Sequence, residues 1–120
     1  MNRKEFLDEL NKRGGYFSFD GAKYEAIIDE SFITDGKEKK LRIAQEECAE
    51  LIQAISKYLR EPDCTGNQLA VLEELADVMI CLNYIAAAMH FSNDDVFNAL
   101  DVKIEREKKR LEEVKNVEEG

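Results

Sequence analysis

The chain has no tryptophan, a single proline and no segment in which polar and apolar residues alternate as they do in a strand. Half-buried strands repeat every two residues, so the missing alternation argues against a sheet. The chain also lacks the Glu-x-x-His sequences that a di-iron carboxylate bundle needs on two of its helices. That class of metal protein is therefore excluded.

Positive charge is scarce too, because 17 lysines and arginines stand against 26 acidic residues, for a formal net charge of -9. A nucleic-acid backbone or an anionic membrane surface requires a basic face, so we expect neither as a partner. The apolar run from Val78 to Met89 is too short to cross a bilayer. Three cysteines without metal-type spacing predict reduced thiols in a cytoplasmic protein.

Helical periodicity extends along the whole chain, and it predicts an all-α fold. A length of 120 residues suggests a single domain over residues 1–120 with one modest core. We expect a helical bundle of three long helices, preceded by shorter N-terminal helices. Capping residues, glycines and Pro62 set the expected boundaries. The helices are predicted to run from Asn2 to Gly14, from Asp20 to about Glu30, from Thr34 or Asp35 to just before Pro62, from Thr65 to about His90, and from Ser92 onward.

The fourth predicted helix is apolar on almost every side after Asp77. A helix of this kind is normally buried all round. Three long helices from one small chain would not cover it, so we expect a second subunit to complete the bundle, in a homodimer or homotetramer. The alternative is a monomer in which the short N-terminal helices cover the same surface.

Two acidic pairs interrupt the apolar helices. Glu47 and Glu50 stand three residues apart, as do Glu74 and Asp77, so each pair projects from one side of its helix. Inward carboxylates repel one another and are costly to desolvate unless a cation neutralises them. Carboxylate oxygens suit hard divalent ions, so we expect Mg²⁺ as the cofactor.

A helical wheel places Glu47 and Glu74 within the core stripe, with Glu50 and Asp77 beside it. The alternative is that all four are ordinary surface charges, in a chain of which 36% is charged. The helical period argues against that alternative for Glu47 and Glu74. Their predicted apolar neighbours are Ile43, Leu51, Ala54 and Tyr58 for the first, and Ala70, Val78, Cys81, Ile85 and Ala88 for the second.

The sequence Glu46-Glu47-x-x-Glu50 followed by Glu74-x-x-Asp77 resembles the acidic motifs of the MazG-like superfamily, the all-α nucleoside triphosphate pyrophosphohydrolases. The resemblance covers roughly residues 39–110, with the core of the domain expected at about 35–112. It implies that both acidic pairs hold Mg²⁺. It also implies hydrolysis of a (d)NTP between its α and β phosphates to a monophosphate and pyrophosphate, for housecleaning or for control of a dNTP pool.

Glu46 and Glu73 each precede one of the implied ligands. In this kind of reaction, metal ions offset charge on the phosphate oxygens and orient an attacking water. Either glutamate could orient or deprotonate that water, or support a ligand from behind. The alternative for both is a solvated charge on the shoulder of the helix.

A triphosphate needs cations beyond the metal. Lys103 and Arg110 lie seven residues apart on one side of the last predicted helix, and Lys57 lies past the first acidic pair. The family often has Lys-x-x-x-Asn-x-x-Arg on that last helix, and Glu107 stands here in place of the Asn. The alternative for each basic residue is an exposed ion pair.

Aromatic residues are the candidates for contact with the nucleotide. Tyr84 lies one helical face away from Asp77, and Tyr16, Phe17 and Phe19 precede the second predicted helix. Ordinary packing is the alternative for all of them.

Two other functions remain open from the sequence. One is a non-catalytic interaction module that keeps a metal-stabilised acidic core. The other is phosphoribosyl-ATP pyrophosphohydrolysis, although that branch commonly has a Tyr-His pair after its second acidic motif, where this chain has Ile80-Cys81-Leu82.

Overall fold

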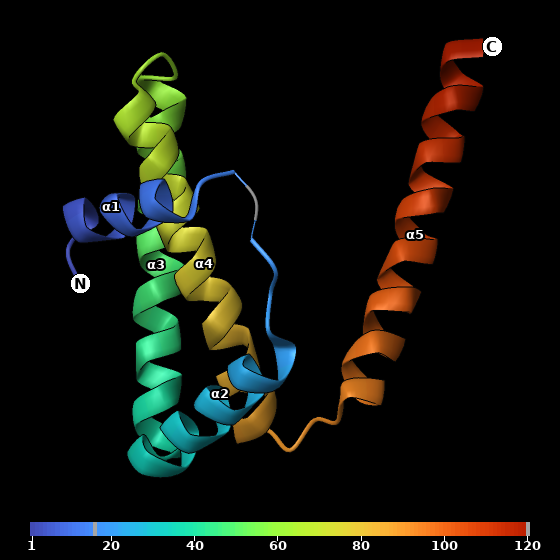
Figure 1. The fold of residues 1–120 in the computed structure, drawn as a ribbon. Coiled ribbons are helices and arrows are strands. Elements are labelled where there is room, and N and C mark those ends of the chain that lie inside the picture. Colours follow the sequence, from blue (N-terminus) through green and yellow to red (C-terminus); the bar gives the residue numbers. More distant parts are fainter. Residues whose placement is uncertain (16, 120) are drawn as a thin grey trace. The chain divides into compact units, whose positions relative to one another are not determined.

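The computed structural model describes residues 1–15 and 17–119, and within them every regular element is an α-helix (Figure 1). The predicted all-α class, with three long helices after two shorter ones, is confirmed. No helix in these ranges has the length and apolar character needed to span a bilayer. The helices are α1 (Arg3–Arg13), α2 (Gly21–Asp35), α3 (Lys37–Arg60), α4 (Thr65–Ala88) and α5 (Asn93–Glu119).

Side-chain caps begin three helices where the sequence predicted them. The Asn2 Oδ1 atom accepts a hydrogen bond from the Glu5 amide at 2.8 Å, and Asp20 caps α2 in the same way. At the start of α5 the Ser92 hydroxyl accepts from the Asp95 amide at 3.1 Å, while the Asp95 carboxylate accepts from the Ser92 amide at 2.8 Å. These caps satisfy amides that have no partner within the helix.

The predicted boundary between the second and third helices is wrong. Helix α2 continues past Glu30 to Asp35, and α3 begins at Lys37, so Thr34 does not start a helix. The two helices are separated by Gly36, whose φ of 86° lies in the region that favours glycine. The chain therefore changes direction within a single residue.

The predicted cap at Thr65 is also wrong. Thr65 is the first residue of α4, and the Cys64 carbonyl oxygen accepts a hydrogen bond from the Asn67 amide at 3.0 Å. The other end of α4 lies at Ala88, just before His90 adopts a φ of 59°.

The core lies between α3 and α4, which run side by side along their length (Figure 1). Ala44 from α3 packs against Cys81 and Tyr84 from α4, and all three are less than a tenth exposed. Ile28 and Phe32 of α2 pack on this cluster. Because the two long helices face each other, residues on their inner sides are brought together.

Lys40 is a buried cation that connects α2, α3 and α4. Its side chain is 6% exposed, and its Nζ atom lies 2.7 Å from both the Ser31 Oγ and the Asp35 Oδ2 atoms. The same Nζ lies 4.4 Å from the centroid of the Tyr84 ring. The hydrogen bond from Lys40 is the main reason that the pKa of Asp35 lies below its usual range. A buried charge is tolerated when partners surround it in this way.

All three cysteines are free thiols. Cys81 is buried, Cys48 is half-buried, and Cys64 is exposed in the turn between α3 and α4. Burial, followed by the negative charge of Glu47, raises the pKa of the Cys81 thiol to about 11. Cys81 therefore stays protonated and acts as a small core residue.

Within the described residues of the compact unit Met1–Ala88, one side of α4 is exposed. Leu72, Leu75, Met79 and Leu82 are between 44% and 58% exposed. An apolar surface of this kind on a folded protein is typical of a contact with another molecule.

The chain divides into two compact units, Met1–Ala88 and Met89–Gly120. The described part of the second unit consists mainly of α5. Within this unit the apolar residues Phe97, Ile104 and Leu111 of α5 are exposed.

Replacing Lys40 with alanine should lower the free energy of unfolding by about 2 kcal/mol or more, because Asp35 and Ser31 lose a buried partner and Tyr84 loses its cover. Urea denaturation measures the change. Lys39→Ala is the matched control, since Lys39 also pairs with Asp35, at 3.3 Å, but is 62% exposed. The control should change stability by less than about 0.5 kcal/mol. If the two substitutions lowered the free energy of unfolding equally, Lys40 would contribute no more than an exposed ion pair with Asp35.

Candidate metal centre

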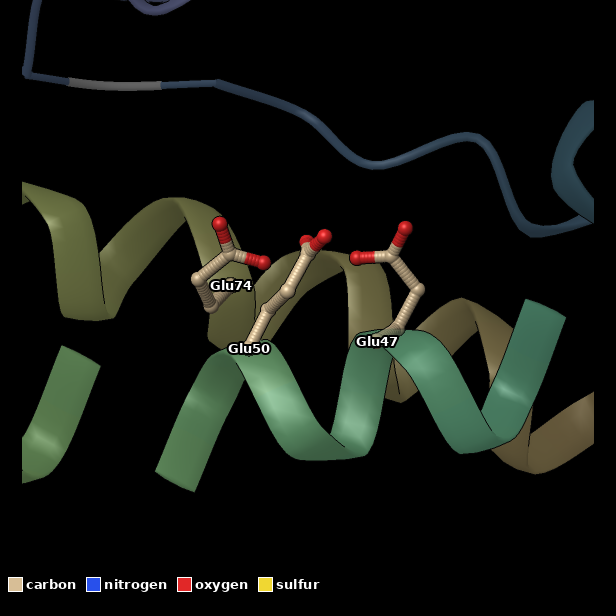
Figure 2. Close-up of side chains that lie close together, drawn as sticks. All are labelled: Glu47, Glu50 and Glu74. Carbon is tan, nitrogen blue, oxygen red and sulfur yellow. The ribbon is translucent and has the colours of Figure 1, made fainter. Parts of the chain in front are cut away.

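Three carboxylates from two helices meet on one side of the α3–α4 hairpin (Figure 2). Glu47 and Glu50 come from consecutive turns of α3, and Glu74 comes from the facing turn of α4. One oxygen from each lies within 4.8 Å of the others. The spacing of three residues on α3 and the side-by-side packing of the hairpin produce this group.

The centre is partly shielded from water. Glu74 is only 8% exposed and Glu47 is half-buried, whereas Glu50 is exposed at the edge. The Oε2 atoms of Glu47, Glu73 and Glu74 are buried without a hydrogen-bond partner among the described residues. Buried polar atoms left in this state are costly, so the arrangement calls for a cation or donor that satisfies them.

Burial and mutual repulsion make these carboxylates hard to ionise. Burial, followed by the charges of Asp77, Glu50 and Glu74, raises the pKa of Glu47 to about 7. Burial, followed by the charges of Glu50 and Asp77, raises the pKa of Glu74. A site that penalises negative charge in this way gains most when a positive ion binds.

Asp77 belongs to the same electrostatic cluster, although the group within 4.8 Å does not include it. Burial is the main reason that the pKa of Asp77 is raised. A hydrogen bond with Glu47 acts in the opposite direction, and the charges of Glu73 and Glu50 add to the increase. Asp77 therefore belongs to the same group of mutually repelling carboxylates.

The two glutamates that precede the predicted ligands differ in their surroundings. Glu46 is exposed on α3, whereas Glu73 is half-buried on α4 with one oxygen unsatisfied. Their predicted part in activating water stays a prediction, but Glu73 has the more sheltered position.

A comparison with known protein families now bears on the chain as a whole. The sequence model of the MazG nucleotide pyrophosphohydrolase domain matches residues 36–111, more than half of the chain. The chain belongs to the MazG family. The match includes all of α3 and α4 and therefore the whole carboxylate cluster. Searches of curated proteins and of solved structures found no match to the chain.

The carboxylates of this MazG domain suit a hard divalent cation. Oxygen atoms from Glu47, Glu50 and Glu74 converge, two of these residues carry a buried and unsatisfied oxygen, and Asp77 adds a fourth acidic group. Such all-oxygen surroundings are typical of Mg²⁺ and related ions. The predicted roles of the four residues as ligands stay predictions.

The structure places two of the predicted substrate residues within the first unit. Lys57 is exposed near the end of α3. Tyr84 is 6% exposed and lies in the core beneath Lys40 rather than in a pocket. The packing alternative for Tyr84 therefore has direct support from its contacts.

Lys103 and Arg110 lie on α5, in the second unit. The Nε and Nη2 atoms of Arg110 donate hydrogen bonds of 2.9 and 2.6 Å to Glu107. The hydrogen bond from Arg110 is the main reason that the pKa of Glu107 is lowered. Glu107, which stands where the family often has Asn, therefore pairs with Arg110, one of the predicted substrate-binding residues.

The aromatic residues before α2 are presented to solvent. Phe17 is 58% exposed and Phe19 is 67% exposed, with the Phe19 ring 5.3 Å from that of Tyr24. Tyr16 lies outside the described residues. The predicted contact of these aromatic residues with a nucleobase stays a prediction.

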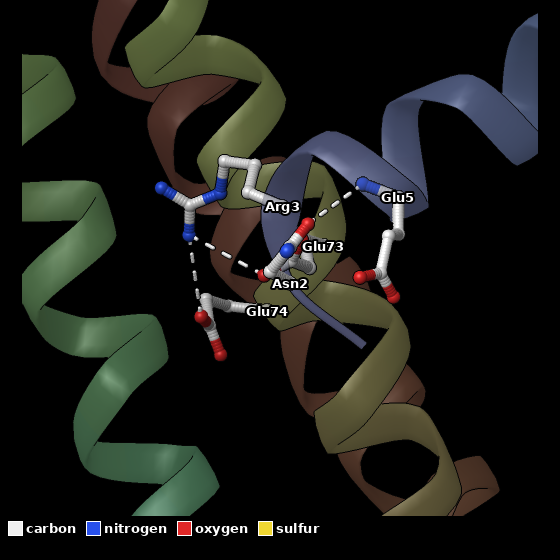
Figure 3. Close-up of polar contacts among 5 residues, drawn as sticks. All are labelled: Asn2, Arg3, Glu5, Glu73 and Glu74. Atoms are coloured by element: carbon white, nitrogen blue, oxygen red, sulfur yellow. Dashed lines mark hydrogen bonds and ion pairs between the residues drawn. The ribbon is translucent and has the colours of Figure 1, made fainter.

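Sequence reasoning missed Arg3, which reaches the carboxylate cluster from α1 (Figure 3). Its Nη2 atom lies 3.4 Å from Glu73 Oε1 and 3.6 Å from Glu74 Oε1. Arg3 precedes the region that matches the MazG family, so no motif pointed to it. Only the packing of α1 on α4 reveals the contact.

Without added metal, the stability of the protein should fall as the pH rises from about 4.5 to about 7. Glu47 keeps its proton to about pH 7 in the folded chain, whereas it ionises near 4.5 in the unfolded chain, so the folded state binds more protons in this window. Glu47→Gln should flatten this trend. At about pH 7.5 the variant should be the more stable protein by about 1–2 kcal/mol, a value reduced for partial exposure. Thermal unfolding across the pH range measures both effects.

Adding Mg²⁺ should raise the melting temperature more at about pH 7.5 than at about pH 5.5, because carboxylate ligands bind metal when deprotonated. The Glu47→Gln variant should lose most of this increase. Glu38→Gln, which removes an 81% exposed carboxylate on the same helix, should retain it. A wild-type protein whose stability ignores both pH and Mg²⁺ would contradict a sheltered carboxylate cluster.

Proposed function

We propose that this MazG-family protein is a Mg²⁺-dependent nucleoside triphosphate pyrophosphohydrolase. It converts a (d)NTP to a (d)NMP and pyrophosphate, either to remove unwanted nucleotides or to control a dNTP pool. The observation that carries this proposal is the convergence of Glu47, Glu50 and Glu74 within 4.8 Å, with buried oxygens that have no partner among the described residues.

In the proposed mechanism, Glu47, Glu50, Glu74 and Asp77 would hold Mg²⁺. When bound, the ion offsets the charge of the phosphate oxygens. The burial of Glu47 and Glu74 limits water at the centre and strengthens electrostatic attraction there. With a divalent ion bound, the cluster of carboxylates would become able to bind phosphate.

Glu73 is the residue best placed to accept the proton of the attacking water. Its half-buried carboxylate has an unsatisfied oxygen and lies next to Glu74 in the sequence. The oxygen of water forms a bond to phosphorus as the bridging bond between the α and β phosphates breaks. Pyrophosphate leaves with the electron pair of that bond, and the proton of water passes to Glu73. Glu46, which is exposed, would support the site from its rim.

We also propose that the protein acts in the cytoplasm as a homodimer or homotetramer. The three free thiols support a reducing compartment. Assembly with a second copy is supported by the exposed apolar residues on one side of α4, which are Leu72, Leu75, Met79 and Leu82. In a two-fold dimer this side of α4 would be buried in both subunits by the same contact.

Wild-type protein should release pyrophosphate from at least one member of a panel of NTPs and dNTPs in the presence of Mg²⁺. Glu47→Gln and Glu74→Gln should each reduce kcat/KM by about 100-fold or more, since each removes a charged metal ligand. Glu38→Gln on α3 should retain full activity, because its carboxylate is 81% exposed and forms only a surface ion pair.

Circular dichroism of the same variants would show whether the helices survive the substitutions. No turnover of any nucleotide at high enzyme concentration, together with a rise in melting temperature on adding Mg²⁺, would favour the non-catalytic module.

Substituting Met79 or Leu82 with glutamate should shift the protein toward monomers, because each places a charge within the apolar side of α4. Light scattering coupled to size-exclusion chromatography measures the mass. Gln53→Glu, on the exposed polar face of α3, should leave the mass unchanged. A wild-type protein that is monomeric at all concentrations would rule out the proposed assembly.

A further inference from the structure

Arg3 stands at the edge of the carboxylate cluster in a position that the fold determines. It is the first residue of α1, immediately after the Asn2 cap. Helix α1 rests on α4, where Met1 and Phe6 line a small hollow together with Glu73, Ala76 and Asp77. The guanidinium consequently faces Glu74 and also Glu73, which lies 70 positions away in the sequence (Figure 3).

The contacts of Arg3 with these glutamates are loose. Its Nη2 atom lies 3.4 Å from Glu73 and 3.6 Å from Glu74, whereas strong charge-assisted hydrogen bonds are about 2.7–2.9 Å long. The Arg3 side chain is 46% exposed. An ion pair that is long and open to water contributes little to stability, so the guanidinium can change partners at small cost.

A triphosphate bound at this centre needs a cation from the protein. Among the described residues of the first unit, Arg3 is the basic residue that forms an ion pair with the cluster. Lys40, the buried cation of the same unit, is enclosed by Ser31 and Asp35 and is not free to change partners. A guanidinium also matches the geometry of phosphate oxygens better than an ammonium group does.

We propose that Arg3 is a substrate-binding residue that contacts the phosphate oxygens of the triphosphate at the carboxylate centre. This inference rests on the proposed function and adds to it a residue outside the region shared with the MazG family. Glu73 and Glu74 hold the guanidinium at the rim, and the phosphates take it over when they bind. The N-terminal helix therefore forms part of the substrate site.

The test measures the binding of inorganic tripolyphosphate in the presence of Mg²⁺ by calorimetry, because this probe carries the phosphates without a base or sugar. Arg3→Gln should weaken binding about tenfold, as expected for the loss of a charge-assisted contact. Arg3→Lys should lose less, because it keeps the charge but not the forked geometry. Lys4→Gln is the matched control, since it removes an exposed charge from the neighbouring position on α1, and it should bind like the wild type.

A second measurement separates phosphate contact from damage to the metal centre. Mn²⁺ alone, followed by its paramagnetic resonance signal, should bind to Arg3→Gln at least as tightly as to the wild type, because a competing cation has been removed. For a nucleotide that the wild type hydrolyses, Arg3→Gln should raise KM about tenfold and change kcat by less than about threefold. Circular dichroism and the melting temperature should match those of the wild type.

Unchanged tripolyphosphate binding in Arg3→Gln and Arg3→Lys would overturn the inference, and so would an equal loss in Lys4→Gln. Weaker binding of Mn²⁺ alone would also overturn it, since Arg3 would then act only on the shape of the centre. A wild-type protein that hydrolyses no nucleotide would refute the proposed function, while the comparison of tripolyphosphate binding would still decide the role of Arg3.

Discussion

Repulsion between carboxylates on α3 and α4 is the constraint around which the first unit of the chain is arranged. The two helices could pack more favourably if Glu47 and Glu74 were apolar, because neither buried Oε2 atom has a hydrogen-bond partner among the described residues. The small core of Ala44, Cys81 and Tyr84 nevertheless holds the helices together beside this cluster. A fold that keeps unfavourable charge at one place, and compensates for it nearby, is typical of a functional site.

Much of the fold follows from local signals and was therefore predictable. The helical period of apolar residues identified α3, α4 and α5, and the caps at Asn2 and Ser92 fixed two helix starts through contacts spanning only three residues. The same period placed Glu47 and Glu74 toward the core. The boundary at Gly36 was missed because it depends on a positive φ angle, whereas the preceding Thr34 and Asp35 resemble ordinary caps.

Features that depend on distant contacts could not be predicted in this way. Lysine is seldom buried, and nothing near Lys40 in the sequence indicates that Ser31 and Tyr84 will surround it. Arg3 meets Glu73 only because α1 folds back onto α4. The spacing of apolar residues predicts which face of a helix is buried, but it does not predict which lysine or arginine from another helix will contact that face.

Because Cys64 is exposed, it is a site at which the α3–α4 hairpin can be labelled chemically. Thiolates, rather than thiols, react with alkylating reagents, and Cys81 is buried with its pKa raised to about 11. Cys64, by contrast, is exposed in the turn where the chain passes from α3 to α4. A maleimide dye should therefore react with the turn between α3 and α4 before it reacts with the core cysteine, and this turn could carry a fluorescent label without the introduction of a new cysteine.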